Sequence, residues 1–179
     1  QQFETFVDSI KADEAYGRIH HFHSLLTHTP YVFDERGKRH SLPPSQEAFG
    51  PGADVDLVWQ SYTNQAMFAD SLLGTVIAKL KSESLYDEAI IIITADHGVG
   101  SIAGSGRFSD EEVADYTAWV PLIIRSPTLS PGVSEIDYQH VDFRPTLLEL
   151  LGREPEQGLE GVSAFSDQRP ERDKVFYYV

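Results

Sequence analysis

The amino-acid sequence predicts an α/β fold, a sandwich in which helices flank a mostly parallel sheet. A long stretch with helical spacing, residues 57–84, runs directly into an isoleucine-rich segment at 89–94. Such an apolar run is typical of a strand that is buried on both faces of a parallel sheet. A second strand pattern at 120–125 and a second helix pattern at 143–151 continue the alternation that characterises α/β folds.

Length and composition fit one globular domain and exclude several classes of function. The chain has 179 residues, of which 41% are hydrophobic, enough for a sizeable core. The 28 acidic and 14 basic side chains give a net charge of −14, which argues against nucleic-acid binding. Because the chain has no cysteine, it contains no disulfide, cysteine nucleophile or thiolate metal site. No apolar stretch approaches the roughly 20 residues of a membrane-spanning helix.

The first third of the chain predicts a helix, a strand and a loop. Residues 3–11 have apolar side chains at helical spacing. Residues 18–27, rich in aromatic and apolar side chains and bounded by Gly17 and Pro30, are expected to form a buried strand. Residues 29–56 are rich in proline, glycine and charge, and we expect a long surface loop there.

The remaining elements follow from apolar spacing and from residues that end helices. The predicted helix at 57–84 has an apolar stripe at three- and four-residue intervals, formed by Val58, Tyr62, Ala69, Leu72, Leu73, Val76, Ile77 and Leu80. The helix at 143–151 has Pro145 in its first turn and Gly152 as its stop. Residues 98–118 are expected to form a polar loop, and residues 174–179 a final strand.

Polar side chains with metal-binding chemistry follow the isoleucine run. Asp96 and His97 supply a carboxylate and an imidazole, which suit a divalent ion. Neighbouring residues within a strand point to opposite faces, but Gly98 permits a turn that lifts this restriction. Ligands in α/β folds lie at the carboxyl ends of strands. The run that ends at His28 is a second such segment, and we expect His28 and Asp96 to face one cleft.

Five sequence blocks, in order, resemble the sulfatase family of the alkaline phosphatase superfamily. The most specific runs from Gly74 through Leu85-Tyr86-Asp87 and the isoleucines to Asp96-His97-Gly98, and resembles the family's metal-binding segment. The other four are Phe22–Pro30 with its His-x-Pro ending, Val120–Ile124, Val141–Gly152 with Pro-Thr-Leu, and Gly158–Ser163. Together they span residues 19–163. This resemblance implies an alkaline-phosphatase-like sandwich, of which residues 1–179 form a C-terminal part of the catalytic domain.

The resemblance also implies roles for individual residues. Asp96 and His97 correspond to metal ligands, and the cofactor would be a divalent ion: Ca, Mn, Zn or Mg. His28 corresponds to a catalytic, substrate-contacting histidine that donates to an anionic group or protonates a leaving alkoxide. His23 is a weaker substrate-binding candidate. His140 is a weak metal-ligand candidate, because its surroundings resemble a helix entry more than a zinc site.

The sequence departs from the family in lacking a nucleophile motif. No Cys/Ser-x-Pro-x-Arg segment is present, since 41–45 lacks the arginine and follows the His-x-Pro block. We therefore expect an N-terminal segment of the same protein to complete the site, and the isolated 179 residues to be inactive. Without that segment, an uncovered sheet edge invites self-association. The protein is expected to be extracytoplasmic or anchored to a membrane through a segment outside this chain.

Three functions stay open on the sequence alone. The first is metal-dependent hydrolysis of sulfate or phosphate esters by a sulfatase-like enzyme. The second is the activity of a membrane-anchored phosphoglycerol or phosphoethanolamine transferase. The third is a non-catalytic sulfatase-like binding or scaffold domain. The absent Glu-His-Gly continuation after Gly98 weakens the sulfate assignment, and family resemblance alone does not identify the ester.

Overall fold

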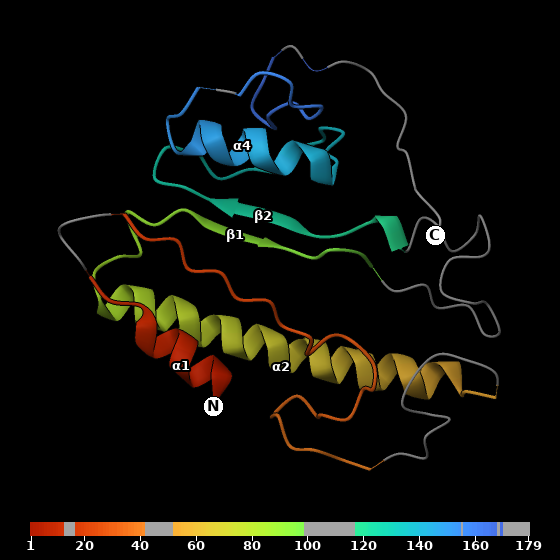
Figure 1. Ribbon diagram of the computed structural model, residues 1–179. Helices are drawn as coiled ribbons and strands as arrows, with labels where there is room; N and C mark the ends of the chain where they lie inside the picture. Colours follow the sequence, from red (N-terminus) through yellow and green to blue (C-terminus); the bar gives the residue numbers. More distant parts are fainter. Residues whose placement is uncertain (13–16, 42–51, 99–116, 155, 168, 170–179) are drawn as a thin grey trace. The chain divides into compact units, whose positions relative to one another are not determined.

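The computed structural model describes residues 1–12, 17–41, 52–98, 117–154, 156–167 and 169 (Figure 1). These residues divide into two compact units, one made of residues 1–89 and 97–120 and the other of residues 90–96 and 121–179. The first unit contains helices α1 and α2. The second contains strands β1 and β2, a 3-10 turn η2 and helix α4. No helix among the described residues is both long and apolar enough to cross a membrane.

Helix α2, Val55–Ser82, is the main element of the first unit and confirms the predicted helix at 57–84. The side chain of Asp54 caps its N-terminus by accepting a hydrogen bond of 3.2 Å from the Leu57 amide. At the other end, Ser84 has a φ of +60°, and the Leu85 amide donates to the Leu80 carbonyl at 2.8 Å. This left-handed residue lies just beyond the end of the helix, where the chain can no longer continue as α-helix.

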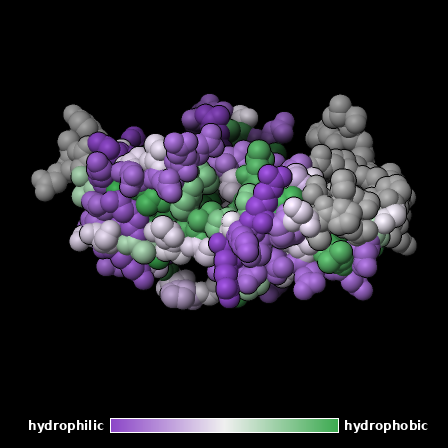
Figure 2. All heavy atoms as spheres, turned by 90° about the horizontal axis from the view of Figure 1, so that it is seen from below, coloured by the Kyte–Doolittle hydropathy of each residue, from purple (hydrophilic) through white to green (hydrophobic). Residues whose placement is uncertain are grey.

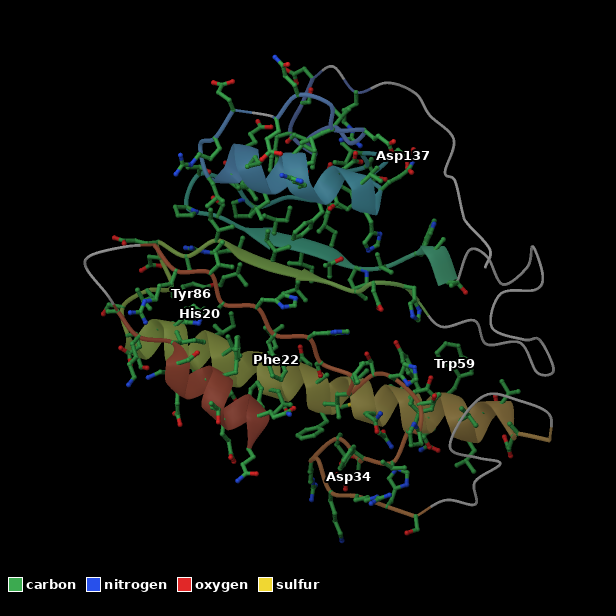
Figure 3. All side chains as sticks on the ribbon, in the orientation of Figure 1. His20, Phe22, Asp34, Trp59, Tyr86 and Asp137 are labelled. Carbon is green, nitrogen blue, oxygen red and sulfur yellow. The ribbon has the colours of Figure 1, made fainter. Side chains whose placement is uncertain are left out.

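Helix α1, Gln2–Ser9, confirms the predicted first helix and packs on α2. Aromatic side chains join it to the segment that follows. The ring centroids of Phe6 and Phe22 lie 4.8 Å apart, and those of Phe3 and Phe22 lie 5.6 Å apart in an edge-on contact. Figure 3 labels Phe22 and His20 on this segment. Ile10, just after α1, is fully buried.

The predicted strand at 18–27 is not formed. Its residues are almost all exposed, and within the described part of the chain no neighbouring strand pairs with them. A strand requires a ladder partner for its backbone. Here the carbonyl of Leu26 instead accepts a hydrogen bond from the side chain of Gln65 on α2. The apolar pattern was therefore misleading at this segment.

The predicted surface loop at 29–56 is wrong for its beginning, because Tyr31 and Val32 are buried. The loop then forms a tight turn whose ends meet in an isolated antiparallel bridge between Phe33 and Arg39. Asp34, labelled in Figure 3, stabilises this turn: its Oδ1 accepts from the amides of Arg36 and Lys38 at 3.0 and 2.7 Å. The burial follows from contact with α2, where the rings of Tyr31 and Tyr62 lie 5.4 Å apart.

Strands β1, Ile91–Thr94, and β2, Leu122–Arg125, confirm the two predicted strands of the second unit. They run antiparallel, with Ile92 opposite Ile124, and Figure 1 draws their arrows in opposite directions. The expected parallel pairing is therefore wrong for these two strands. Antiparallel edge strands are common on otherwise parallel sheets, so the orientation of one pair does not conflict with an α/β fold.

Helix α4, Phe143–Leu150, confirms the predicted helix at 143–151 and its ends. Pro145 lies in its first turn. Gly152 has a φ of +63°, and its amide donates to the Glu149 carbonyl at 2.9 Å. Glycine adopts this conformation without the cost imposed by a Cβ atom. The predicted polar loop at 98–118 and the predicted strand at 174–179 lie largely or wholly outside the described residues.

Figure 2 shows one face on which hydrophilic side chains predominate, with apolar groups between them. Among the large apolar side chains described, Val133, Ile19 and Trp119 are the most exposed.

Candidate metal and substrate site

The Asp96–His97 segment begins directly after β1, where the chain leaves the strand. Ala95 and Asp96 follow Thr94, the last residue of β1, and a bend is centred on Asp96. Asp96 is exposed and His97 is half-buried. The predicted position of this pair at the end of a strand is therefore confirmed, and the strict alternation of side chains no longer applies there.

The ring of His97 is oriented by a main-chain carbonyl. Its Nδ1 lies 2.7 Å from the carbonyl oxygen of Gly98. A carbonyl oxygen can only accept, so the Nδ1 must carry the proton and the Nε2 of the neutral ring carries the lone pair. Histidines that bind metals characteristically hold their second ring nitrogen in this way. The amide of Gly98 is itself anchored, because it donates to the Thr117 carbonyl at 2.7 Å.

His140 contacts the turn that carries Asp96. It begins the 3-10 turn η2, His140–Asp142, and its Nε2 lies 2.7 Å from the carbonyl oxygen of Ala95. By the same argument the Nε2 carries the proton in this arrangement. The weak metal-ligand role of His140 stays a prediction. The described contact instead joins its imidazole to the main chain one residue before Asp96.

His28 lies in the exposed segment before Pro30, and its ring orientation resembles that of His97. The Nδ1 of His28 lies 2.7 Å from the carbonyl oxygen of Thr29, the next residue. Because Nδ1 carries a proton, Nε2 carries the lone pair when the ring is neutral. When the ring is charged, Nε2 carries the second proton. The peptide bond between Thr29 and Pro30 is cis.

The main chain around His28 is bound by the side chain of Gln65 on α2. The Nε2 of Gln65 donates to the carbonyl oxygens of Leu26, His28 and Pro30, with the last two at 3.3 and 3.5 Å. Its Oε1 accepts from the amides of Val32 and Phe33 at 2.9 and 3.0 Å. Gln65 is 1% exposed. The sequence analysis missed this residue, although a polar side chain between Tyr62 and Ala69 on the apolar stripe is a detectable signal.

The second unit contains a buried network of hydrogen bonds and an ion pair, centred on Asp142 just before α4. Asp142 is fully buried, and its Oδ1 and Oδ2 accept from the amides of Val162 and Gln139 at 2.8 and 3.0 Å. Arg169 adds a guanidinium 2.9 Å from Oδ2. Sequence analysis missed Arg169, since no local pattern joins two residues so far apart in the chain.

Burial beside this network raises the pKa of Tyr138 to about 12. Burial disfavours the phenolate, the nearby carboxylate of Asp142 adds to the effect, and the guanidinium of Arg169 opposes it. Tyr138 is therefore a neutral phenol at physiological pH.

The structure links two of the predicted site residues, Asp96 and His140, and divides the set between the two units. Asp96 and His140 belong to the second unit, where Ala95 links them; His28, His97 and His23 belong to the first. His23 is exposed, and its substrate-binding role stays a prediction. Among the described residues, no group of three or more histidine, cysteine or acidic side chains is arranged to hold a metal ion. The carboxylate of Asp96 and the Nδ1-protonated imidazole of His97 are suitable ligands for a divalent ion. Two side chains are only part of a ligand set, since a metal site usually has three or more protein ligands.

The chain is similar to known proteins over most of its length. The Sulfatase family model matches residues 3–153. Lipoteichoic acid synthase 1 of Bacillus subtilis (strain 168) is 30% identical over 155 residues, which cover 82% of this chain and 23% of the synthase. Arylsulfatase K of Xenopus laevis is 34% identical over 98 residues, which cover 53% of this chain and 18% of that protein.

One solved structure adds a comparison in three dimensions. The phosphonate monoester hydrolase from Silicibacter pomeroyi matches with a TM-score of 0.55 and 34% sequence identity, over 62% of this chain and 22% of the hydrolase. The chain thus spans about a fifth of the length of these relatives. The order of the sequence blocks, the α/β architecture and the similarity to these proteins all point to one family. The chain belongs to the sulfatase family and has the fold of the alkaline phosphatase superfamily.

Proposed function

We propose that this chain forms part of the catalytic domain of a metal-dependent hydrolase that cleaves sulfate, phosphate or phosphonate esters. The observation that carries the proposal is the state of His97. Its Nδ1–H donates to the Gly98 carbonyl, so its Nε2 has the lone pair that a metal ligand requires, and the carboxylate of Asp96 is the preceding residue. A divalent ion bound there would stabilise negative charge on the oxygens of the ester.

The chain's own residues have distinct roles in this proposal. Asp96 and His97 hold the ion. His28 contacts the anionic group and, when protonated at Nε2, donates a proton to the leaving oxygen. Its Nδ1–H is held by the Thr29 carbonyl, which keeps the ring in one orientation as Nε2 gains and loses a proton.

The substrate class is an anionic ester, and the nucleophile lies outside these 179 residues. Since the relatives are several times longer than the part they share with this chain, we place the nucleophile and the remaining ligands in an N-terminal segment of the same protein. We also propose that the intact protein works outside the cytoplasm, and cell fractionation tests this directly.

Transfer of a phosphoglycerol group is the second candidate. The similarity to lipoteichoic acid synthase 1 covers 82% of this chain, against 53% for arylsulfatase K. The two activities differ in the acceptor, which is water for a hydrolase and a second alcohol for a transferase. The proposed roles of Asp96 and His97 as metal ligands, and of His28 at the substrate, are the same for both activities.

The test uses the full-length protein, stripped with a chelator and reloaded with Mn, Zn, Ca or Mg. It is assayed on an aryl sulfate, an aryl phosphonate monoester and phosphatidylglycerol vesicles. Turnover of an aryl ester that depends on metal, and is lost with Asp96→Ala and His97→Ala, would support a hydrolase. Release of diacylglycerol only from the vesicles would support the transferase. Asp8→Ala and His21→Ala, which change an exposed acidic residue and an exposed histidine with no role in the proposed site, are matched controls.

Metal content gives a second measurement that does not depend on substrate. Asp96→Ala and His97→Ala should bind the ion at least about 10-fold more weakly, whereas the controls should bind it normally. Unchanged metal content in both variants would refute the ligand assignment. Absence of all turnover together with normal metal binding would favour the binding or scaffold domain.

A further inference from the structure

We infer that Gln65 of α2 is a positioning residue that holds His28 in its working orientation. The inference rests on the proposed function for the role of His28, and on geometry for the role of Gln65. All of its contacts lie within the first unit, between one helix and the segment 26–33.

The side chain of Gln65 uses its full hydrogen-bonding capacity on this segment. The amide oxygen has two lone pairs, and these accept from the amides of Val32 and Phe33 at 2.9 and 3.0 Å. The amide nitrogen has two protons, and these face three carbonyl oxygens, including that of His28 at 3.3 Å. Since Gln65 is 1% exposed, water does not replace these bonds when they are lost.

The contacts connect Gln65 to the ring of His28 in two steps. Gln65 binds the carbonyl of His28 and the carbonyl of Pro30, so the main chain is fixed on both sides of Thr29. The carbonyl of Thr29 then accepts the Nδ1–H of His28 at 2.7 Å. A shift of the Thr29 peptide would therefore turn the imidazole, and with it the Nε2 that faces the substrate.

Upstream of His28 the segment contacts α1, where the ring of Phe22 lies 4.8 Å from that of Phe6. The residues from Arg18 to Leu25 are exposed, and within the described chain this stretch forms no strand. Burial begins only at Tyr31 and Val32, beyond the cis peptide bond. The hydrogen bonds from α2 thus span the interval between the exposed stretch and the buried one, which is where His28 lies.

The test compares Gln65→Met, which keeps the volume and loses every hydrogen bond, with Gln60→Met, an exposed glutamine on the same helix. In the full-length protein, Gln65→Met should lower kcat by on the order of 10- to 100-fold, because small displacements of a catalytic group are costly. Gln60→Met should leave kcat unchanged. Amide exchange at Val32 and Phe33 should be about 10-fold faster in Gln65→Met only.

A double-mutant cycle with His28→Ala separates positioning from general stability. If Gln65 acts through His28, Gln65→Met should cause little further loss of kcat once His28 is already alanine. Equal losses in both backgrounds would overturn the inference, because a merely structural residue lowers activity regardless of His28. Wild-type kcat in Gln65→Met would overturn it as well.

Gln65→Glu keeps the inference testable if Gln65→Met does not fold. The carboxylate still accepts from Val32 and Phe33, but presents an oxygen instead of a donor to the three carbonyls. We expect kcat to fall at least as far as in Gln65→Met, and normal kcat would refute a role for the donor side. If His28→Ala itself retains wild-type kcat, the proposed role of His28 fails. Faster exchange at Val32 and Phe33 would then still support Gln65 as the residue that orders the segment.

Discussion

The guanidinium of Arg169 lies 2.9 Å from the Oδ2 of Asp142, whose side chain is fully buried. The same guanidinium donates through Nη1 to the carbonyls of Val162 and Ser163 at 2.9 and 2.8 Å. Asp142 is the residue before α4, and Gly161 to Ser163 belong to the short block after that helix. The guanidinium of Arg169 therefore joins two of the sequence blocks that resemble the family, Val141–Gly152 and Gly158–Ser163.

Arg169→Met should destabilise the protein by about 3–5 kcal/mol, because it leaves the buried carboxylate of Asp142 without its charged partner. Arg153→Met is the matched control, since Arg153 is exposed and surface substitutions usually change stability by less than about 0.5 kcal/mol. Urea unfolding of both variants measures the difference. Equal midpoints would contradict a stabilising role for the pair.

Gly161→Ala should also destabilise the second unit, for a steric reason. A Cβ atom at this position would lie 1.9 Å from the carbonyl oxygen of Val141 and 2.9 Å from the amide nitrogen of Asp142. Both are main-chain atoms, so the backbone must shift, at a cost of about 1–3 kcal/mol. Gly132→Ala is the control, because nothing lies within 4 Å of a Cβ atom there. A thermal melt in which Gly161→Ala matches the control would exclude the close approach.

The elements that the sequence predicted well are those with a strong local pattern. The stripe at 57–84 predicted α2, Val55–Ser82, to within two residues at each end. Pro145 and Gly152 correctly bounded α4, because capping and turn conformations are local properties. The turn after β1 with Asp96 and His97 was likewise predictable, since an apolar strand and a following glycine are adjacent in sequence.

The predictions that failed concern features that depend on contacts between residues distant in the chain. The segment 18–27 has the composition of a strand, but without a ladder partner in the described structure it is no strand. The antiparallel orientation of β1 and β2 depends on the path between them. The pair of Asp142 and Arg169 could not be predicted for the same reason. Gln65 was the exception, because its polar side chain interrupts the apolar face of α2 and marks a buried contact.

Stability at high pH should depend on Tyr138. Its pKa in the folded protein is about 12, above the usual value of 10.0, chiefly because burial disfavours the phenolate. Below pH 10 Tyr138 keeps its phenolic proton in both the folded and the unfolded protein, and its contribution to stability is fully present. As pH rises from 10 to 12, the unfolded state ionises first and stability is lost. Tyr138→Phe should lose less stability over this interval in urea melts than the parent does. Identical pH profiles would show that the Tyr138 pKa is not raised.

The 179 residues alone should hydrolyse neither aryl sulfates nor aryl phosphates above the buffer rate. No cysteine is present, and the described residues contain no group of three metal-binding side chains. A divalent ion that acts as a Lewis acid usually has three or more protein ligands. The measurement is turnover of the purified chain with added Mn, Zn, Ca and Mg. Metal-dependent turnover that survives repurification and disappears in Asp96→Ala would reveal a nucleophile within this sequence.

His140 should affect metal binding through the main chain of the Asp96 turn. Its Nε2 donates to the Ala95 carbonyl at 2.7 Å, so His140→Ala frees the residue that precedes Asp96 without removing a carboxylate or imidazole from the pair. In the full-length protein we expect the affinity for the ion to fall by about 10-fold, the lower end for residues that orient a ligand. Titration calorimetry with Mn or Zn measures this, with His21→Ala as the exposed control. His140→Gln retains a donor that can reach the same carbonyl and should recover part of the affinity. Complete loss of binding in both His140 variants would instead identify His140 as a ligand, and normal affinity in both would show that the contact with Ala95 does not hold the turn.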